Sequence, residues 1–295
     1  MASSKPDQVY AYDADEKIHW LKRLREFGQY RYLLQNLVVR NVKARYKNSA
    51  LGILWSMLNP LGLMLVFTIL FSVLSGNNAP RQYPVFVLVG IIPWRFFSDS
   101  LMGGSVTVLN NGHLIKKVYF PRELLPISTL LSELINFLFG FLVLIVFLYA
   151  FDLGLTRYAL WVPLILLTQL VFSLGLSFFL STITTFYRDV MLILDVVLQA
   201  WFFLTPVFYS FETLFGVNST FMGITFNPAQ IMRWLNPMAS IIDGYRTVLW
   251  GTMNSDGAVS MNPVYLLRTL VQSVIILIIG YIVFVRSEHL FGEKL

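Results

Sequence analysis

Long uncharged stretches alternate with short charged segments along this chain, and the alternation predicts helices that cross a membrane. Lys47 and Arg81 enclose 33 residues without a charged side chain, and Arg157 and Arg188 enclose 30. A membrane-spanning helix needs only about 20 predominantly apolar residues. We therefore expect an all-α integral membrane protein.

Six segments have the length and hydropathy of a membrane span. The first carries Asn59-Pro60 and the second carries Pro93. Proline bends a helix because it lacks a backbone donor, and neighbouring helices absorb such a bend in a membrane. Asp99 follows Arg95 by one helical turn, so we expect the two side chains to pair. The six transmembrane helices are predicted at about 49–75, 83–109, 127–151, 161–186, 190–209 and 264–285.

Residues 1–48 are predicted to form a cytosolic tail with an amphipathic helix, ahead of a six-helix transmembrane domain at 49–295. From residue 16 to residue 27, the helical period of about 100° per residue separates apolar side chains from charged ones. Such a helix lies in the membrane interface with its apolar side down, although packing on a protein surface fits the pattern too. Its apolar face carries Trp20, Leu21, Leu24 and Phe27.

The region before the last span, about 210–263, differs from the spans. It holds Asn227-Pro228, Asn236-Pro237, Asp243-Gly244 and two shorter apolar pieces, at about 221–235 and 238–250. Neither piece is long enough to cross a bilayer with certainty, and segments of this length are often re-entrant or interfacial. We expect short re-entrant helices here.

Positive charge is distributed unevenly between the two sides of the predicted membrane. Only 13% of the residues are charged, against about 25% in a soluble domain. Of the 22 Lys and Arg, sixteen fall in the N-terminal region, after the second span, after the fourth span and in the C-terminal tail. Because basic loops stay cytoplasmic, both termini are predicted to be cytoplasmic. Basic residues at membrane edges also fit anionic lipid better than nucleic acid.

No catalytic or metal-binding pattern is visible in the sequence. The chain has no cysteine, and His19, His113 and His289 lie far apart. HExxH and GxxxxGK[ST] motifs are absent, so we expect no catalytic residue, metal or cofactor in this chain. Glu133 and Asp195 lie within predicted spans, where buried charges are often functional. Both a structural role and ion coupling fit their positions.

Aromatic residues are abundant, at 16% of the chain. Interfacial belts and lipid contact account for most of them. Aromatic faces also stack on the C–H faces of sugars, so uncharged aromatic side chains suit a wide pore for a glycan. Nine are candidates for such a channel: Phe67, Phe71, Phe86, Trp94, Phe97, Phe202, Phe203, Phe208 and Tyr209.

A short charged segment at 111–126 separates the second and third spans. Lys116, Lys117 and Arg122 make it basic, and its apolar residues are costly to leave bare in water. We interpret it as a short helix that presents an apolar face with a basic rim to a cytosolic partner. An amphipathic turn resting on lipid headgroups fits equally well.

Four short motifs occur in order along the chain. They are RYKNSALG at 45–52 followed by Trp55 and LNPL at 58–61, GIIPWRFF at 90–97, LIKKVYFPRELLP at 114–126, and LNPM at 235–238 followed by GYR at 244–246. Together with the six spans, they resemble the permease subunits of ABC exporters of the type-2 family. The branch that is most similar exports O-antigen, capsule and teichoic-acid polymers.

The resemblance implies a homodimer of permease subunits with two separate ATPase subunits docked below it, which hold ATP and Mg²⁺. It implies export of a lipid-linked polysaccharide across the bacterial cytoplasmic (inner) membrane by a chain that is not itself an enzyme. The 111–126 segment is then the coupling helix, and Phe120→Asp is expected to leave folding intact but to uncouple ATP hydrolysis from export. The implied ATPase-coupling residues are Ile115, Lys116, Lys117, Tyr119, Phe120, Pro121, Arg122, Glu123, Tyr187 and Arg188.

Other classes of membrane protein are compatible with parts of the pattern. An ion-coupled secondary transporter would use Glu133 or Asp195, although such folds usually contain inverted repeats, and none is visible. A membrane-embedded transferase needs convergent acid, base or metal groups, and the sequence offers none. Export of another amphipathic substrate by the same family is a further alternative.

Overall fold

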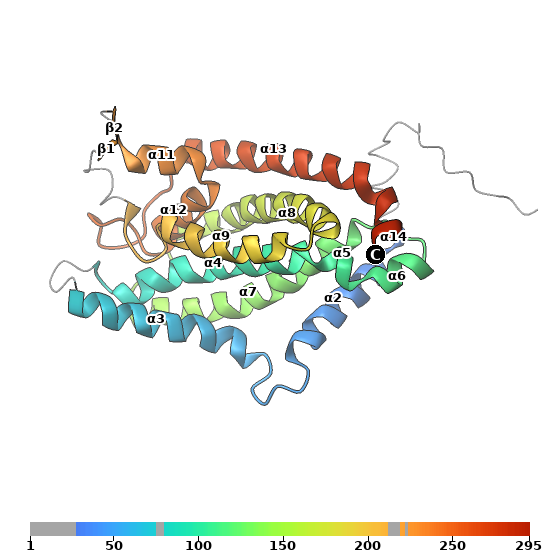
Figure 1. Ribbon diagram of the computed structural model, residues 1–295. Coiled ribbons are helices and arrows are strands. Elements are labelled where there is room, and N and C mark those ends of the chain that lie inside the picture. The colour runs from blue at the N-terminus through green and yellow to red at the C-terminus, as the bar shows by residue number, and fades with distance from the viewer. Residues whose placement is uncertain (1–27, 75–79, 212–218, 222–223) are drawn as a thin grey trace, which may run out of the picture.

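The computed structural model describes residues 28–74, 80–211, 219–221 and 224–295. The predicted interface helix, with Trp20, Leu21, Leu24 and Phe27, lies outside the described residues. The described chain is almost entirely helical (Figure 1), which confirms the all-α fold class.

Five helices of the described chain are long and apolar enough to cross a membrane. Their ends lie within about five residues of the spans predicted from hydropathy. Pro60 and Pro93 lie inside intact helices, as predicted. The five helices are α3 (Leu54–Leu74), α4 (Tyr83–Ser105), α7 (Leu124–Ala150), α8 (Val162–Phe186) and α13 (Pro263–Ser287).

The fifth predicted span, at about 190–209, is shorter in the structure. α9 (Val190–Leu204) has 15 residues, a length of about 22 Å at roughly 1.5 Å per residue, against the roughly 30 Å of bilayer hydrocarbon. The chain is extended at Thr205, because the residue that precedes a proline avoids helical geometry. Six full-length spans are therefore not confirmed: the described chain has five, with α9 as a shorter apolar helix.

A buried arginine holds the irregular turn that follows α9. Arg246 is 4% exposed and donates hydrogen bonds to the carbonyl oxygens of Pro206 and Val207, both at 2.9 Å. Its guanidinium carbon also lies 3.8 Å from the centroid of the Phe86 ring. Gly90 of α4 permits this arrangement, because a Cβ there would lie 2.5 Å from the Val207 oxygen. The turn after α9 is therefore fixed against α4.

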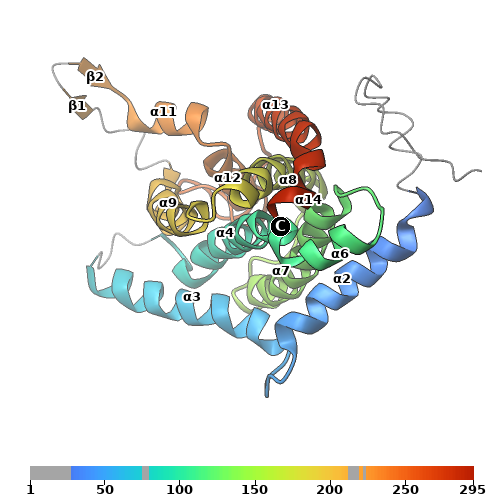
Figure 2. The ribbon, with the colours of Figure 1, turned by 45° about the vertical axis from the view of Figure 1, so that its right-hand side comes forward.

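α4 occupies the centre of the molecule (Figure 2). It contacts α3, α7, α8, α9 and α12 (Pro237–Leu249). Residues on every side of α4 are buried, as its nearly continuous apolar sequence requires, since a helix that is hydrophobic all round is a buried one. The larger hydrophobic core of the protein forms around this helix.

α8 and α13 cross with their backbones in contact, and theirs is the most extensive contact between two helices of the described chain. A Cβ on Gly175 of α8 would lie 2.6 Å from the Cα of Leu277. A Cβ on Gly280 of α13 would collide with the carbonyl oxygen of Gly175. Small residues allow membrane helices to approach this closely.

One end of the bundle collects the segments that are predicted to be cytosolic (Figure 1). α2 (Arg31–Tyr46) packs along α7. α5 (Thr107–Asn110) and α6 (Gly112–Lys117) follow α4, and η3 (Glu288–Leu290) and α14 (Phe291–Lys294) follow α13. Segments that the charge pattern assigns to one side of the membrane therefore meet at one end of the molecule.

The opposite end holds the region before the last span (Figure 1). α11 (Pro228–Leu235) and α12 occupy the two predicted apolar pieces, and an asparagine side chain caps the N-terminus of each. The first piece, predicted at 221–235, is only partly helical. It begins within an antiparallel hairpin of β1 (Ser219–Phe221) and β2 (Ile224–Phe226), which the hydropathy pattern did not predict.

Candidate functional site

The segment between α4 and α7 is anchored to the bundle by a small hydrophobic cluster. Ile115 and Phe120 are buried, at 8% and 4% exposure. The same cluster holds Phe178 of α8, Phe284 of α13 and Phe291 of α14. The centroid of the Phe284 ring lies 5.1 Å from that of Phe178 and 5.3 Å from that of Phe291. Elements from three parts of the chain therefore meet beneath the residues that surround α6.

Burial corrects part of the predicted ATPase-coupling surface. Ile115, Phe120 and Glu123 belong to the predicted set, but all three are buried, and Glu123 Oε1 accepts a hydrogen bond from the Tyr281 hydroxyl at 3.2 Å. These side chains hold the segment in place and do not face a partner. The burial of Phe120 argues against the expectation that Phe120→Asp leaves folding intact, because a carboxylate would be buried in a hydrophobic cluster.

The exposed residues of the segment form a basic surface with one protruding aromatic side chain. Tyr119 is 85% exposed, and Lys116 and Lys117 are exposed at the end of α6. Arg188, from the turn between α8 and α9, lines the same groove as Lys116. The groove has a volume of about 500 Å³ and is lined by Leu109, Gly112, His113, Lys116, Arg188 and Leu295. The structure thus brings predicted residues from two distant segments together.

The remaining predicted coupling residues lie at the edge of this surface. Tyr187, next to Arg188, is exposed. Pro121 and Arg122 are half-buried between the extended segment and the start of α7. The coupling role of all these residues stays a prediction.

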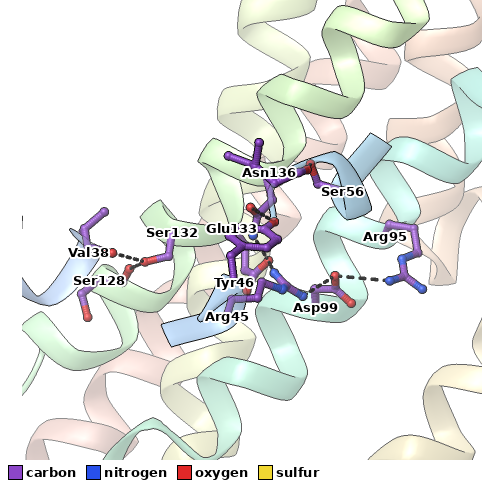
Figure 3. A network of polar contacts seen from close by, with 11 residues as sticks. Val38, Arg45, Tyr46, Ser56, Arg95, Asp99, Ser128, Ser132, Glu133 and Asn136 are labelled. Atoms are coloured by element: carbon purple, nitrogen blue, oxygen red, sulfur yellow. Dashed lines mark hydrogen bonds and ion pairs between the residues drawn. The ribbon is translucent and has the colours of Figure 1, made fainter. Parts of the chain in front are cut away.

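A network of charged and polar side chains joins the end of α2 to α4 and α7 (Figure 3). The Arg45 guanidinium forms one ion pair with Glu133 of α7 and a second, at 3.0 Å, with Asp99 of α4. Arg95 lies 3.7 Å from the same Asp99 carboxylate, which confirms the predicted pair one helical turn apart. Glu133 also accepts a hydrogen bond from the Asn136 amide at 3.0 Å. One arginine therefore ties three helices together.

Arg45 keeps its positive charge within this network. Burial by itself lowers the pKa of Arg45, but the carboxylates of Glu133 and Asp99 outweigh burial and raise the pKa above its ordinary value. A charged Arg45 in turn offsets the cost of holding carboxylates within apolar helices. The pairing gives Glu133 a structural role and removes the need to assign it to ion coupling.

Asp195, the second carboxylate considered for ion coupling, has different surroundings. It is exposed on α9 and accepts a hydrogen bond from Gln199 at 3.2 Å, one turn further along the same helix. Exposed apolar residues make up most of the remaining surface of α9. Asp195 and Glu133 therefore belong to separate elements and form no shared ion site.

A cavity of about 210 Å³, with both polar and apolar walls, opens beside the Arg45 network. Its walls come from α2, α3, α4 and α7, and the Tyr46 hydroxyl donates a hydrogen bond to Asn136 Oδ1 at 2.6 Å on one side of it. Among the residues that line it are Arg45, Tyr46, Trp55, Ser56, Asn59, Arg95, Phe96, Asp99, Glu133, Asn136 and Phe137. The cavity brings the charged side chains of the network next to apolar side chains of α3, α4 and α7.

The nine aromatic residues proposed for a channel form one continuous series of ring contacts, with Tyr83 as an additional link. Phe67 of α3 stacks on Phe208, with 5.1 Å between ring centroids. Trp94 of α4 lies 5.6 Å from Phe202 of α9. The series therefore joins α3, α4, α9 and the turn after α9. The other contacts are Phe67–Phe202, Phe71–Phe208, Phe71–Tyr83, Tyr83–Phe86, Trp94–Phe97, Phe202–Phe203, Phe202–Phe208, Phe203–Phe208 and Phe208–Tyr209.

Burial divides these rings into two groups. Phe86, Trp94 and Phe97 lie in the core of the subunit, so a substrate does not reach them in this conformation. Phe203 is exposed. The rings of Phe67, Phe71, Phe202, Phe208 and Tyr209 are half-buried. A channel role stays a prediction, and it suits only the rings that keep exposed surface.

Most of the described chain, including α6 and the Arg45 network, matches a known family. The family model for the ABC-2 type transporter covers residues 32–250. This chain belongs to the ABC-2 type transporter family. The match confirms the resemblance inferred from the four motifs, and it places the α6 surface and the Arg246 turn inside the part of the chain that the family shares.

Individual relatives of this ABC-2 family chain cover most of its length. It is 36% identical over 230 residues to the O-antigen export system permease protein RfbA of Myxococcus xanthus, which is 78% of this chain and 85% of the relative. It is 30% identical over 274 residues to the RfbA protein of Klebsiella pneumoniae, which is 90% of this chain and 96% of the relative. It is 23% identical over 235 residues to the polysialic acid transport protein KpsM of Escherichia coli, which is 78% of this chain and 85% of that protein.

Sequence reasoning on this ABC-2 chain found the Arg95–Asp99 pair but missed the pairing of Arg45 with Glu133 and Asp99. Glu133 and Asp99 were visible as carboxylates within spans, and a carboxylate in that position requires a cation nearby. Arg45 was visible only as one of many basic residues before the first span. Its position in the RYKNSALG motif was the signal that set it apart.

Proposed function

We propose that this chain is the transmembrane permease subunit of an ATP-driven exporter that moves a lipid-linked polysaccharide across the bacterial cytoplasmic membrane. The relatives named for O-antigen export and polysialic acid transport support a glycan substrate. Membership of the ABC-2 family supports a transport subunit whose energy comes from partner ATPase subunits, which bind ATP and Mg²⁺. The observation that carries the proposal is the exposed basic surface of α6.

The ATPase subunits dock on this basic surface in our proposal. Lys116, Lys117 and Arg188 favour a partner with an acidic face, because complementary charge steers association. Tyr119 protrudes from the surface, and tyrosine is frequent among the residues that dominate binding energy at interfaces. Phe120 connects the same segment to the cluster that α8 and α13 share. A movement imposed at Tyr119 is thereby passed to the membrane helices.

A homodimer supplies the channel in this proposal. α3 and α9 expose broad apolar faces, and the series of aromatic rings runs between these two helices. A second copy placed against both faces would enclose the exposed part of the ring series. Uncharged aromatic surface suits the passage of sugars, which stack on it through their C–H faces.

The α6 end of the bundle is cytoplasmic in this arrangement. The excess of Lys and Arg in segments at that end supports this orientation. Both chain termini are then cytoplasmic, and the hairpin and α11 face the opposite side. The protein is a multi-pass protein of the inner membrane in contact with membrane lipid.

Purification from native membranes in mild detergent tests the proposal. We expect an ATPase chain to co-purify in equal number with this protein. Reversing charge in the double variant Lys116→Glu/Lys117→Glu should reduce the yield of the ATPase. The matched control is Arg157→Glu in η2 (Arg157–Trp161), since Arg157 is an exposed arginine at the other end of the bundle. This control variant should leave the yield of the ATPase unchanged.

A transport measurement completes the test. Vesicles that contain the co-purified complex should move a lipid-linked glycan only when ATP is hydrolysed. If the protein purifies alone and supports transport driven by an ion gradient without any ATPase, the exporter proposal is refuted.

A further inference from the structure

Two arginines from different helices stack around one tyrosine at the end of the bundle opposite α6. The guanidinium carbon of Arg233, in α11, lies 4.3 Å from the centroid of the Tyr265 ring of α13. Arg268 follows Tyr265 by about one turn of α13, and its guanidinium carbon lies 5.8 Å from the centroid of the Tyr265 ring. The same carbon lies 4.8 Å from the centroid of the Trp234 ring. Two positive charges are therefore held close together at the junction of α11 and α13.

The two arginines differ in their partners within the described part of the chain. Asp243 lies 3.3 Å from Arg233. Arg268 donates instead to two neutral oxygens, the Arg233 carbonyl at 2.6 Å and the Ser240 hydroxyl at 2.9 Å. Within the described ranges no carboxylate oxygen lies within 4.0 Å of Arg268, and its Nε has no hydrogen-bond partner. Arg268 is thus a cation without a counter-charge from the described chain.

Exposed apolar side chains lie next to Arg268. Trp234 and Leu235 of α11 are 61% and 78% exposed. An exposed stripe begins beside Arg268 and continues down α13 at helical spacing. It consists of Leu267, Val271, Ile275 and Ile278, each between 46% and 62% exposed. Trp and Tyr mark the headgroup level of a bilayer, so Arg268 lies at that level with an apolar track leading from it into the membrane.

We propose that Arg268 and Arg233 bind the phosphate of an anionic phospholipid whose acyl chain lies along the α13 stripe. Arginine suits this role because its planar guanidinium presents a fixed fork of donors that matches phosphate oxygens. The phosphate would supply the counter-charge that Arg268 lacks, and the apolar stripe of α13 would cover the acyl chain of the lipid. The phosphate therefore meets cationic side chains, and the acyl chain meets apolar side chains.

The position of the site favours a resident membrane lipid over a transported one. α13 lies on the side of the molecule away from α3 (Figure 2), whereas α3 carries Phe67 and Phe71 of the aromatic series. A lipid bound at Arg268 thus lies on the opposite side of the molecule from Phe67 and Phe71. The inference does not depend on which substrate the protein exports.

Lipid selectivity of the purified full-length protein tests the proposal. Binding of phosphatidylglycerol and of phosphatidylcholine to delipidated protein is measured by native mass spectrometry and by the rise in melting temperature. We expect wild-type protein to bind phosphatidylglycerol about fivefold more tightly, because a cation near an anionic headgroup contributes about 1 kcal/mol. Arg268→Gln should lose this preference. Arg157→Gln should keep it, since Arg157 is likewise stacked on an aromatic ring, 5.2 Å from the Tyr158 centroid, but is fully exposed.

Three outcomes would overturn the proposal. The first is equal affinity of the wild-type protein for both lipids, a measurement that needs no variant and so survives a folding defect in Arg268→Gln. The second is an unchanged preference in a folded Arg268→Gln protein. The third is displacement of the bound lipid by a polyprenyl phosphate but not by added phosphatidylglycerol, which would assign the site to the carrier of a transported glycan.

Discussion

Tyr119 and Phe120 are neighbours in the sequence with opposite surroundings, and their alanine variants should separate coupling from folding. Phe120 is 4% exposed within the cluster beneath α6, whereas Tyr119 is 85% exposed. Truncating a buried phenylalanine to alanine destabilises a protein by about 3–5 kcal/mol. Substitutions on an exposed surface usually change stability by about 0.5 kcal/mol or less. We therefore expect the two variants to differ in the free energy of unfolding by about 3 kcal/mol or more.

That difference is large enough to measure in detergent solution. Because about 1.4 kcal/mol corresponds to a factor of ten in an equilibrium constant, a loss of about 3 kcal/mol in Phe120→Ala should raise the unfolded fraction about a hundredfold. Thermal unfolding followed by circular dichroism reports the stability of each variant. ATP hydrolysis and glycan export by the reconstituted complex report coupling. Tyr119→Ala should melt like wild type while ATP hydrolysis is no longer matched by export.

The reverse pattern would refute this reasoning. If Tyr119→Ala melted well below wild type and Phe120→Ala did not, the assignment of one side chain to the core and the other to the partner would be wrong. If Tyr119→Ala left both stability and export unchanged, the proposal that the ATPase docks on the α6 surface through Tyr119 would be refuted.

Three further substitutions test individual contacts. Glu133→Gln should destabilise the protein by about 1–3 kcal/mol, because the arginine at the end of α2 loses a buried partner; an unchanged melting temperature would argue against the ion pair. Gly90→Ala should cost about 1–3 kcal/mol, because its Cβ would lie 2.5 Å from a carbonyl oxygen in the turn after α9, whereas Gly62→Ala has open space and should not destabilise. Asn236→Ala should cost about 2–3 kcal/mol, since Asn236 caps α12 and also bonds to α9 and the turn after it; an unchanged melting temperature would contradict this.

The long helices were predictable because the membrane leaves an apolar segment few alternatives. A chain that cannot bond to water in the bilayer core must satisfy its backbone internally, so a run of more than about 20 apolar residues becomes a helix. The end of α9 was harder to predict. Pro206 marks it, but Pro60 and Pro93 lie inside intact helices. A proline by itself therefore does not distinguish a bend from an end.

The α6 surface and the Arg45 network were less predictable than the long helices, because both depend on contacts between distant segments. α6 has only six residues, too few for helical periodicity to show which side faces the bundle. Tyr119 and Phe120 follow α6 in a segment without regular structure, so no periodicity distinguished them in the sequence. Arg45 and Glu133 lie on different helices, and the N-terminal region contains many other basic residues. Only the packing of α2 along α7 selects this pair.

The crossing of α8 and α13 bears on how the two ends of the molecule communicate. Gly175 and Gly280 leave no side chain between the two backbones, so neither helix slides along the other without a collision. α13 is 25 residues long, about 38 Å at roughly 1.5 Å per residue. It is followed by Phe291 beneath α6 and carries Tyr265 beside α11 near its other end. Because the two backbones are in direct contact, we expect α8 and α13 to move together, so that a displacement at the α6 end would also displace the α11 end.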